Sequence, residues 1–431
     1  MSNELAGLIA IMAMVVFMFM GMWIGLAMAV VGFLGYAYMD GFHTALLNLG
    51  TIPFSNLANY NVTPVPLFVF MGALVSSTGI SSDLYNTAYK WFGQMRGGLA
   101  VSTVAACAAF AAICGSSMAS AVTMGKVALP EMQARNYDNS LATAVVASGG
   151  TLGILIPPSM GFIMYGIITE NSVGELFMAG ILPGILLSLL FIGVVVLWCW
   201  RKPAAGPAGP NTTFKDKVVS LKGTWMMIAL FLLVLGGIYF GIFTPTESGA
   251  IGAAGAFLIT LLTRRLGRKH LVESMLETGM TTASVMFILT GAFIFMRMLA
   301  VSQLPTVLAD FVGGLTLSRY AIMAVIVVFY IILGMFLEIM SATVFTVPIL
   351  YPLVINLGFD PIWFGVIIVI IIEMGLITPP VGMNVFVLAS ATKINMGTIF
   401  RGVYPFALAM LLLVILLTIF PQIATFIPQR M

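Results

Sequence analysis

Long apolar stretches separated by short polar segments recur along the whole chain. Residues 181–200 and 225–243 are two of them, and each is long enough to cross the hydrocarbon core of a bilayer as a helix. The stretches are continuously apolar and lack the alternation that a half-buried strand shows. The pattern predicts an all-α polytopic membrane protein with about ten to twelve helical elements at membrane depth.

Composition supports this interpretation. Of the 431 residues, 61% are hydrophobic and 8% are charged, whereas soluble domains carry about 25% charged residues. Glu4 is the only charged residue before the first apolar stretch, so the basic region of a cleaved signal peptide is missing and the stretch is expected to stay in the membrane. The three cysteines show no metal-site spacing. The net charge of +3 reflects loop placement and indicates no nucleic-acid partner.

Basic residues gather in two loops, 201–222 and 264–269. Two apolar stretches joined by the segment FTPTES lie between these loops, so both loops face the same side of the membrane. The positive-inside rule makes that side cytoplasmic. Counting back along the chain places the basic segments 90–96 and 126–135 on the same side.

Several motifs recur at one spacing. Pro130 and Pro352 are 222 residues apart, and so are the proline pairs 157–158 and 379–380 and the glycines 180 and 402. The spacing predicts an internal duplication that covers about residues 62–200 and about residues 280–427. Basic residues flank the first copy of one motif, MASAV at 118–122, and few charged residues flank the second copy, MSATV at 340–344. The two repeats are therefore expected to have inverted topology, as in secondary transporters.

Each repeat contains two interruptions of helical structure. Residues 97–113 extend about 25 Å as a helix, and the GSS at 115–117 then turns the chain back, which predicts a re-entrant hairpin. The segment GGTLGILIPPS, residues 149–159, must break a second helix, because a proline pair removes two backbone donors. Broken backbone at membrane depth is tolerated only where it is buried in protein or lines a cavity. Residues 81–95 and 304–315 read as interfacial arm helices.

Unwound carbonyls and small hydroxyls offer the oxygen ligands that Na⁺ prefers. We expect two pseudo-symmetric Na⁺ sites, one in each repeat, although small residues at these positions also suit plain helix packing. The first site comprises Cys114, Ser116, Ser117, Gly153, Ile156 and Pro158, and the second comprises Glu338, Ser341, Gly375, Thr378 and Pro380.

The broken helices also expose amides at the start of each following half-helix, which favour an anionic group. We assign Ser159, Arg297, Glu373 and Asn384 to substrate binding. Glu373 is the better candidate for tuning the second site, because placing an acidic side chain at membrane depth costs much free energy. A buried hydrogen-bonded acid is the alternative for Glu373, and an interfacial anchor is the alternative for Arg297.

The motifs CGSSMASAV, GTLGILIPPS, FTPTESGA and GLITPPVGMN resemble the large membrane subunit of tripartite ATP-independent periplasmic (TRAP) transporters, in the wider ion-transporter superfamily. The resemblance covers nearly the whole chain. Cys114 departs from it, because family members commonly carry a small polar residue there.

This resemblance implies a multi-pass protein of the bacterial inner membrane that takes up an organic acid with Na⁺, such as a C4-dicarboxylate, sialic acid or another sugar acid. It implies an elevator mechanism, a separate small (Q-type) membrane subunit, and a periplasmic substrate-binding protein. The expected organisation begins with N-terminal scaffold spans over residues 1–61 and a first repeat over residues 62–200. A cytoplasmic linker (201–222), a scaffold hairpin with a basic loop (223–279) and the second repeat (280–431) follow.

Three alternative hypotheses compete with a binding-protein-dependent transporter. A stand-alone sodium/carboxylate symporter would need no binding protein. A channel is conceivable because re-entrant hairpins also line pores. An intramembrane hydrolase could use Ser116 or Ser117, but neither His43 nor His270 lies in a membrane-depth segment beside them, so no enzymatic activity is expected.

Overall fold

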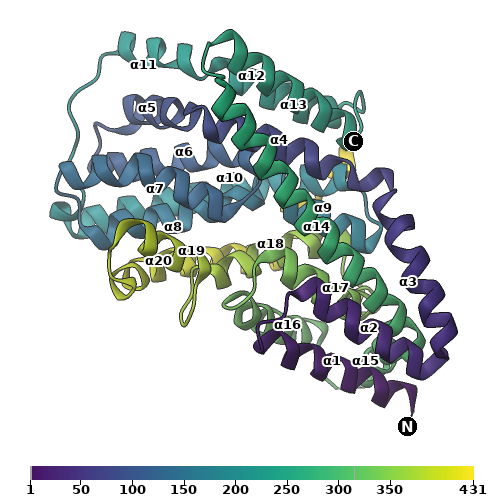
Figure 1. Ribbon diagram of the computed structural model, residues 1–431. Coiled ribbons are helices and arrows are strands. Elements are labelled where there is room, and N and C mark those ends of the chain that lie inside the picture. Colours follow the sequence, from purple (N-terminus) through teal and green to yellow (C-terminus); the bar gives the residue numbers. More distant parts are fainter. Residues whose placement is uncertain (1, 315) are drawn as a thin grey trace.

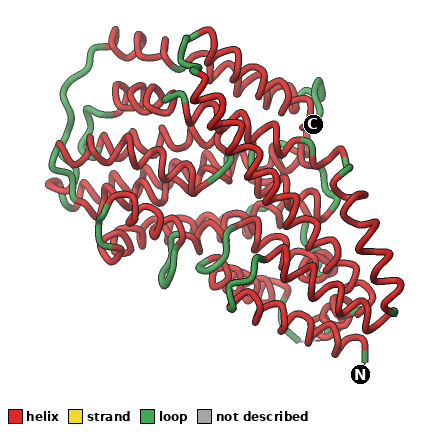
Figure 2. The backbone as a smooth tube through the Cα atoms, viewed as in Figure 1, coloured by secondary structure: helices red, strands yellow, loops and turns green. Residues whose placement is uncertain are grey.

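The described part of the chain folds entirely into helices joined by short loops (Figure 2). The structure is a computed structural model that describes residues 2–314 and 316–431. Within these ranges, seven helices are long and apolar enough to cross a membrane, or up to eight if one bent pair counts as a span. Fewer elements can therefore cross alone than the ten to twelve expected at membrane depth, because seven more apolar helices have only 10–17 residues.

The N-terminal helices pack along one long oblique helix, α14 (Figure 1). Glycines on α2 allow the close approach: a Cβ added at Gly32 would lie 2.8 Å from the Phe295 backbone. The helices of this region are α1 (Asn3–Phe19), α2 (Ile24–Asp40), α3 (Phe42–Leu57) and α14 (Arg268–Ser302). Helices α12 (Trp225–Tyr239) and α13 (Pro245–Leu262) pack on each other, and α13 packs on α4 (Pro64–Ser77).

Two runs of helices have matching bounds at the predicted spacing of 222 residues. Helices α7 and α17, for example, each have 18 residues and begin at Ser117 and Ile339. The first run is α4 (Pro64–Ser77), α5 (Ile80–Phe92), α6 (Gly98–Cys114), α7 (Ser117–Ala134), α8 (Asn139–Leu155), α9 (Met160–Thr169) and α10 (Val173–Arg201). The second run follows the C-terminal half of α14: α15 (Leu304–Gly313), α16 (Arg319–Gly334), α17 (Ile339–Asn356), α18 (Pro361–Leu376), α19 (Met383–Thr392) and α20 (Met396–Ile419), with α21 (Gln422–Thr425) after it.

The two runs exchange contacts. Helix α7 packs against α19, and its counterpart α17 packs against α9. In the same way α8 packs against α20, and α18 packs against α10. Figure 1 shows the first run in blue lying along the second run in yellow-green. Both hairpins therefore meet the broken helix of the other run, which brings four interruptions of helical structure toward one region.

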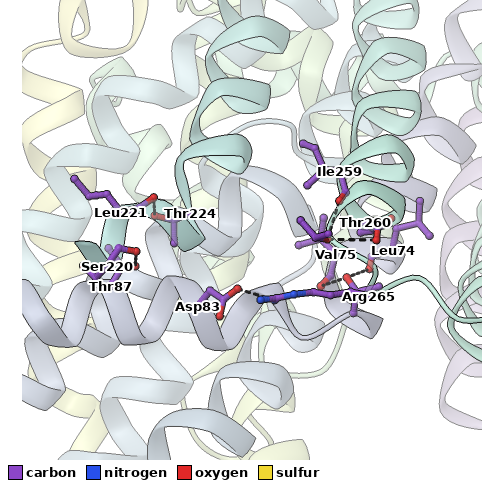
Figure 3. Close-up of polar contacts among 12 residues, drawn as sticks. Leu74, Val75, Asp83, Thr87, Ser220, Leu221, Thr224, Ile259, Thr260 and Arg265 are labelled. Atoms are coloured by element: carbon purple, nitrogen blue, oxygen red, sulfur yellow. Dashed lines mark hydrogen bonds and ion pairs between the residues drawn. The ribbon is translucent and has the colours of Figure 1, made fainter. Parts of the chain in front are cut away.

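The linker after α10 is held against the arm helix α5. It contains α11 (Phe214–Ser220), with short 3-10 turns before it at Pro203–Ala205 and after it at Leu221–Gly223. Two further 3-10 turns lie at Tyr60–Val62 and Pro428–Arg430. The Thr87 hydroxyl donates to the Ser220 carbonyl at 3.0 Å, as Figure 3 shows, and the Trp91 indole donates to the Lys217 carbonyl at 3.2 Å. A segment that sequence alone reads as a free linker is thus a strap across the arm.

A buried indole ties the two ends of the second run together. The Leu417 carbonyl lacks a helical partner because the residue four positions on is Pro421, which has no N–H. The indole nitrogen of Trp363 donates to this carbonyl at 2.7 Å.

Replacing Trp363 with phenylalanine should lower the free energy of unfolding by about 1–3 kcal/mol, because a buried carbonyl loses its only donor. Thermal unfolding in detergent measures this, and Trp200→Phe, at a side chain that is 74% exposed, is the matched control. Equal melting temperatures for the two variants would contradict the expectation.

Candidate functional site

The first hairpin turns at Gly115. Its φ of +63° lies in the left-handed region, where a residue with a Cβ is strained. Ser116 then caps α7 by accepting a 3.4 Å hydrogen bond from the Ala119 amide. Residues 115–117 are therefore a tight turn between two helices, as the sequence predicts.

The second hairpin turns over residues 335–338. Glu338 stands at the N-cap position of α17, and its side chain makes no capping hydrogen bond there. The carboxylate is thus available to other groups. Phe336, at the tip, is 47% exposed.

Both predicted helix breaks are present. Helix α8 ends at Leu155, and α9 begins at Met160 after Ser159, whose hydroxyl accepts from the Phe162 amide at 3.4 Å. Helix α18 ends at Leu376, and the Thr378 hydroxyl donates back to the Met374 carbonyl at 2.6 Å. Each proline pair is joined by a cis peptide bond.

The tip of the first hairpin lies directly against the first break. A Cβ added at Gly153 would lie 2.7 Å from the Ser116 carbonyl oxygen and 2.7 Å from Ser120 Oγ. Cys114, Gly115, Pro158 and Ser159 help to line a cavity of about 10 Å³ between the two. This volume corresponds to about one water-sized sphere. Of the first predicted Na⁺ site, Cys114 and Pro158 line this cavity, Ser116 and Gly153 meet at the contact between tip and break, and Ile156 lines a separate apolar groove.

The second hairpin meets the second break in the same way but more openly. A Cβ added at Gly375 would lie 2.6 Å from the Gly334 Cα. Pro380 is exposed and Thr378 is half-buried, whereas residues 151–160 of the first break are all buried. Ser341 lines a cleft of about 710 Å³ between this hairpin, the α1–α2 connection and α14.

Between the hairpins and breaks lies a group of buried polar side chains without hydrogen-bond partners. Glu373 is 1% exposed, and neither carboxylate oxygen has a partner; the same holds for both amide atoms of Asn384. The side chain of Ser117 faces the Glu373 carboxyl group, and Glu338 lies within electrostatic range of it. On the hairpin and broken helices α7, α8 and α17, the hydroxyls of Ser120, Ser148 and Thr343 are also buried without partners. Buried polar atoms normally find partners, so this group is the candidate site for a polar ligand.

Charge distinguishes the two runs at this point. Glu373 corresponds to Thr151, which is 222 residues earlier and donates its hydroxyl to the Ser148 carbonyl at 2.6 Å. Within the described ranges, Glu373 is the one charged side chain among the fully buried residues. An unpaired buried carboxylate is costly, and a cation bound beside it would neutralise the charge.

The structure does not bring Arg297 into this group. Arg297 lies on the exposed face of α14. Ser159, Glu373 and Asn384 are buried at the two breaks, as expected for groups that face a bound ligand.

Sequence reasoning missed three of the unpartnered hydroxyls. Ser120 could have been found, because it follows Ser116 by four residues and so shares its face of α7. Ser148 and Thr343 carry no such signal, because they become part of the group only when α8 and α17 pack together with the rest.

The donor set suits an alkali cation. Carbonyl, hydroxyl, amide and carboxylate oxygens are hard ligands. Among the described residues, no group of three or more His, Cys, Asp and Glu side chains could hold a transition metal. The arrangement therefore fits Na⁺.

Comparison with known proteins identifies the family. The family model described as "Tripartite ATP-independent periplasmic transporter, DctM component" matches residues 11–423. The C4-dicarboxylate TRAP transporter large permease protein of Pseudomonas aeruginosa is 35% identical, over 87% of this chain and 88% of that protein. The sialic acid TRAP transporter permease protein of Haemophilus influenzae is 29% identical, over 98% of this chain and 68% of that longer protein.

A solved structure supports the fold. The Alcanivorax borkumensis YdaH transporter aligns with a TM-score of 0.66 at 15% identity and covers 89% of each chain. The likeness establishes an all-helical, multi-pass membrane fold of this kind. The family match over residues 11–423 then gives the identity: the chain belongs to the tripartite ATP-independent periplasmic transporter family, as its large permease component.

Proposed function

We propose that this chain is the carrier for sodium-coupled uptake of an organic acid that a periplasmic binding protein delivers. The observation that carries the proposal is the unpartnered Glu373 carboxylate, buried where the two hairpin tips meet the two helix breaks. A site with this charge binds a cation and anion together more readily than it binds an anion alone, because the cation offsets both negative charges. Coupling follows from that charge balance.

Two or more Na⁺ ions are the coupling ions. Carbonyl oxygens and hydroxyls at the tip–break contact near Gly153 form one site, and those near Gly375 form the other. Glu338 and Ser341 belong to the second site, which lies beside the larger cleft. The first site is closed and the second is open, which favours sequential loading.

The carboxylate of the substrate binds at the start of the half-helices. Helices α9 and α19 each have 10 residues and begin at the breaks. Their first amides carry partial positive charge. Ser159 and Asn384 stand at these positions. C4-dicarboxylates, sialic acid and other sugar acids are the candidate substrates.

An elevator movement of an inverted-repeat transport unit is the proposed mechanism. The exchanged packing of α7 with α19 and α9 with α17 supports a two-fold relation between the repeats. Helices α1–α3 and α12–α14 form the scaffold. The protein is expected in the inner membrane with a small membrane subunit.

Uptake of labelled organic acids into proteoliposomes tests the proposal. The vesicles hold this chain with its small subunit, and Na⁺ and the binding protein are each supplied or omitted. Uptake should require both. Uptake with Na⁺ alone would instead establish a stand-alone symporter, and conductance events without coupling would establish a channel.

The arm of the first repeat is fixed to the scaffold by an ion pair. Asp83 of α5 and Arg265, in the basic loop before α14, lie 2.6 Å apart (Figure 3). Both side chains are partly exposed, so the pair contributes about 1 kcal/mol or less to stability.

Exchanging Arg265 for glutamine should therefore leave the melting temperature unchanged but slow uptake about two- to fivefold, since about 0.5–1 kcal/mol of arm positioning is lost. The charge swap Asp83→Arg with Arg265→Asp should recover the rate. Lys269→Gln, which removes a more exposed pair with Glu273, is the control. Identical rates in all four proteins would show that the ion pair has no part in transport.

A further inference from the structure

An apolar groove lies beside the first hairpin and the first helix break, and Ile156 is the one residue of the first predicted Na⁺ site that lines it. The groove has a volume of about 350 Å³. Helices α5, α6, α10 and α12 and the first break contribute to its walls, with Ala109, Ile156, Ile185 and Ile228 among the lining residues. The single polar lining residue, Ser188, donates its hydroxyl to the Gly184 carbonyl at 2.8 Å, so the groove presents no free hydrogen-bonding side chain.

The groove opens between α10 and α12, and not toward the group of buried polar side chains around Glu373. Ile185 and Leu189 on α10 and Ile228 on α12 are exposed members of its lining, at 51%, 58% and 43%. All three belong to apolar candidate spans. In a bilayer this rim faces lipid, so an acyl chain can enter without crossing a polar barrier.

One end of the groove carries positive charge. Leu84, at this end, follows Asp83, and a Cβ added at Gly223 would lie 3.5 Å from the Asp83 Cβ. Lys222 is the residue before Gly223 and is exposed. The Asp83 charge is already paired with Arg265, so the Lys222 ammonium is left to attract an anion.

The surroundings of Lys222 match the level of phospholipid headgroups. Trp225, at the start of α12, is 55% exposed, and tryptophan is enriched where headgroups meet the hydrocarbon core. Both basic loops, which the positive-inside rule places in the cytoplasm, come near this end of the groove, because Gly223 and Arg265 lie beside Asp83. The cytoplasmic leaflet carries the anionic lipids.

We propose that this groove binds one acyl chain of an anionic phospholipid of the cytoplasmic leaflet, with the headgroup phosphate beside Lys222. The lipid lies between the first hairpin and α12. Its binding requires neither Na⁺ nor substrate, so the lipid site can be tested independently of the transport proposal.

Native mass spectrometry of the chain tests the site. The protein is purified with its small subunit, without substrate, from bilayers that contain equal amounts of phosphatidylglycerol and phosphatidylcholine. Ala109→Phe fills the groove from an exposed alanine, and it should lower retained lipid at least about tenfold, because displacing two chain methylenes from apolar contact has about that effect. Leu232→Phe, on the exposed face of α12 outside the groove, is the matched control and should retain lipid as the wild type does.

A second variant tests the headgroup. Lys222→Gln should retain both lipids equally, whereas the wild type and Lys215→Gln, which removes a charge elsewhere on the strap, should prefer phosphatidylglycerol. Unchanged retention in Ala109→Phe would overturn the proposal. So would a photo-crosslinker at Ile228 that captures the small membrane subunit instead of lipid.

Discussion

Replacing Gly153 with valine is expected to abolish uptake while the chain still folds and inserts. The added Cβ would lie 2.7 Å from the Ser116 carbonyl oxygen, which belongs to the backbone of the first hairpin tip and cannot rotate away. Relieving this overlap must push the tip away from the break. A displacement of about 1 Å at a functional site lowers its rate about 100-fold, and the overpacking itself destabilises by about 1–3 kcal/mol.

Gly193→Val controls for the loss of a membrane glycine. Gly193 lies in α10, and a Cβ there meets nothing within 4 Å. Uptake into proteoliposomes, normalised to the folded protein measured by size-exclusion chromatography, separates the two variants. Wild-type uptake by Gly153→Val would contradict the assignment of the tip–break contact to the ion site.

Glu373→Gln is expected to raise the Na⁺ concentration for half-maximal uptake about 10- to 100-fold, because one interaction of a charged group, about 1.5–3 kcal/mol, is lost. The same change should leave thermal stability unchanged or increase it. Glutamine has nearly the same shape and removes a buried unpaired charge, which is unfavourable to folding.

The opposite directions of these two effects make the test specific. A residue that served only packing or hydrogen bonding would lose stability on substitution and would keep its Na⁺ dependence. Glu175→Gln, at an exposed carboxylate in the first turn of α10, should change neither quantity. A Na⁺ dependence of Glu373→Gln equal to that of the wild type would remove Glu373 from the site.

Much of the fold could be predicted from local sequence. The glycine and serines at 115–117 require a turn, and the proline pairs require a break, because these effects act within a few residues of backbone. The bounds of α7 and α17 agree with the 222-residue spacing for the same reason. The inverted orientation of the repeats stays a prediction.

The parts that could not be predicted depend on packing between distant segments. Nothing near Thr343 in the chain shows that its hydroxyl would be buried without a partner. The unequal exposure of the two breaks follows from how closely each hairpin packs on its neighbours. For Arg297 the sequence left substrate binding and an interfacial anchor open, and its exposed position on α14 agrees with the anchor. The strap over α5 was missed because a Pro/Gly-rich composition describes local flexibility and not the carbonyls that Thr87 and Trp91 find.

Co-transport of ²²Na⁺ and a labelled organic acid tests the central claim most directly. Both tracers are followed in the same proteoliposomes, with binding protein outside and the membrane potential clamped. The account predicts that two or more Na⁺ ions enter with each acid and that Glu373→Gln lowers both fluxes together at a fixed low Na⁺ concentration. Uptake of the acid without any accompanying Na⁺ would contradict it.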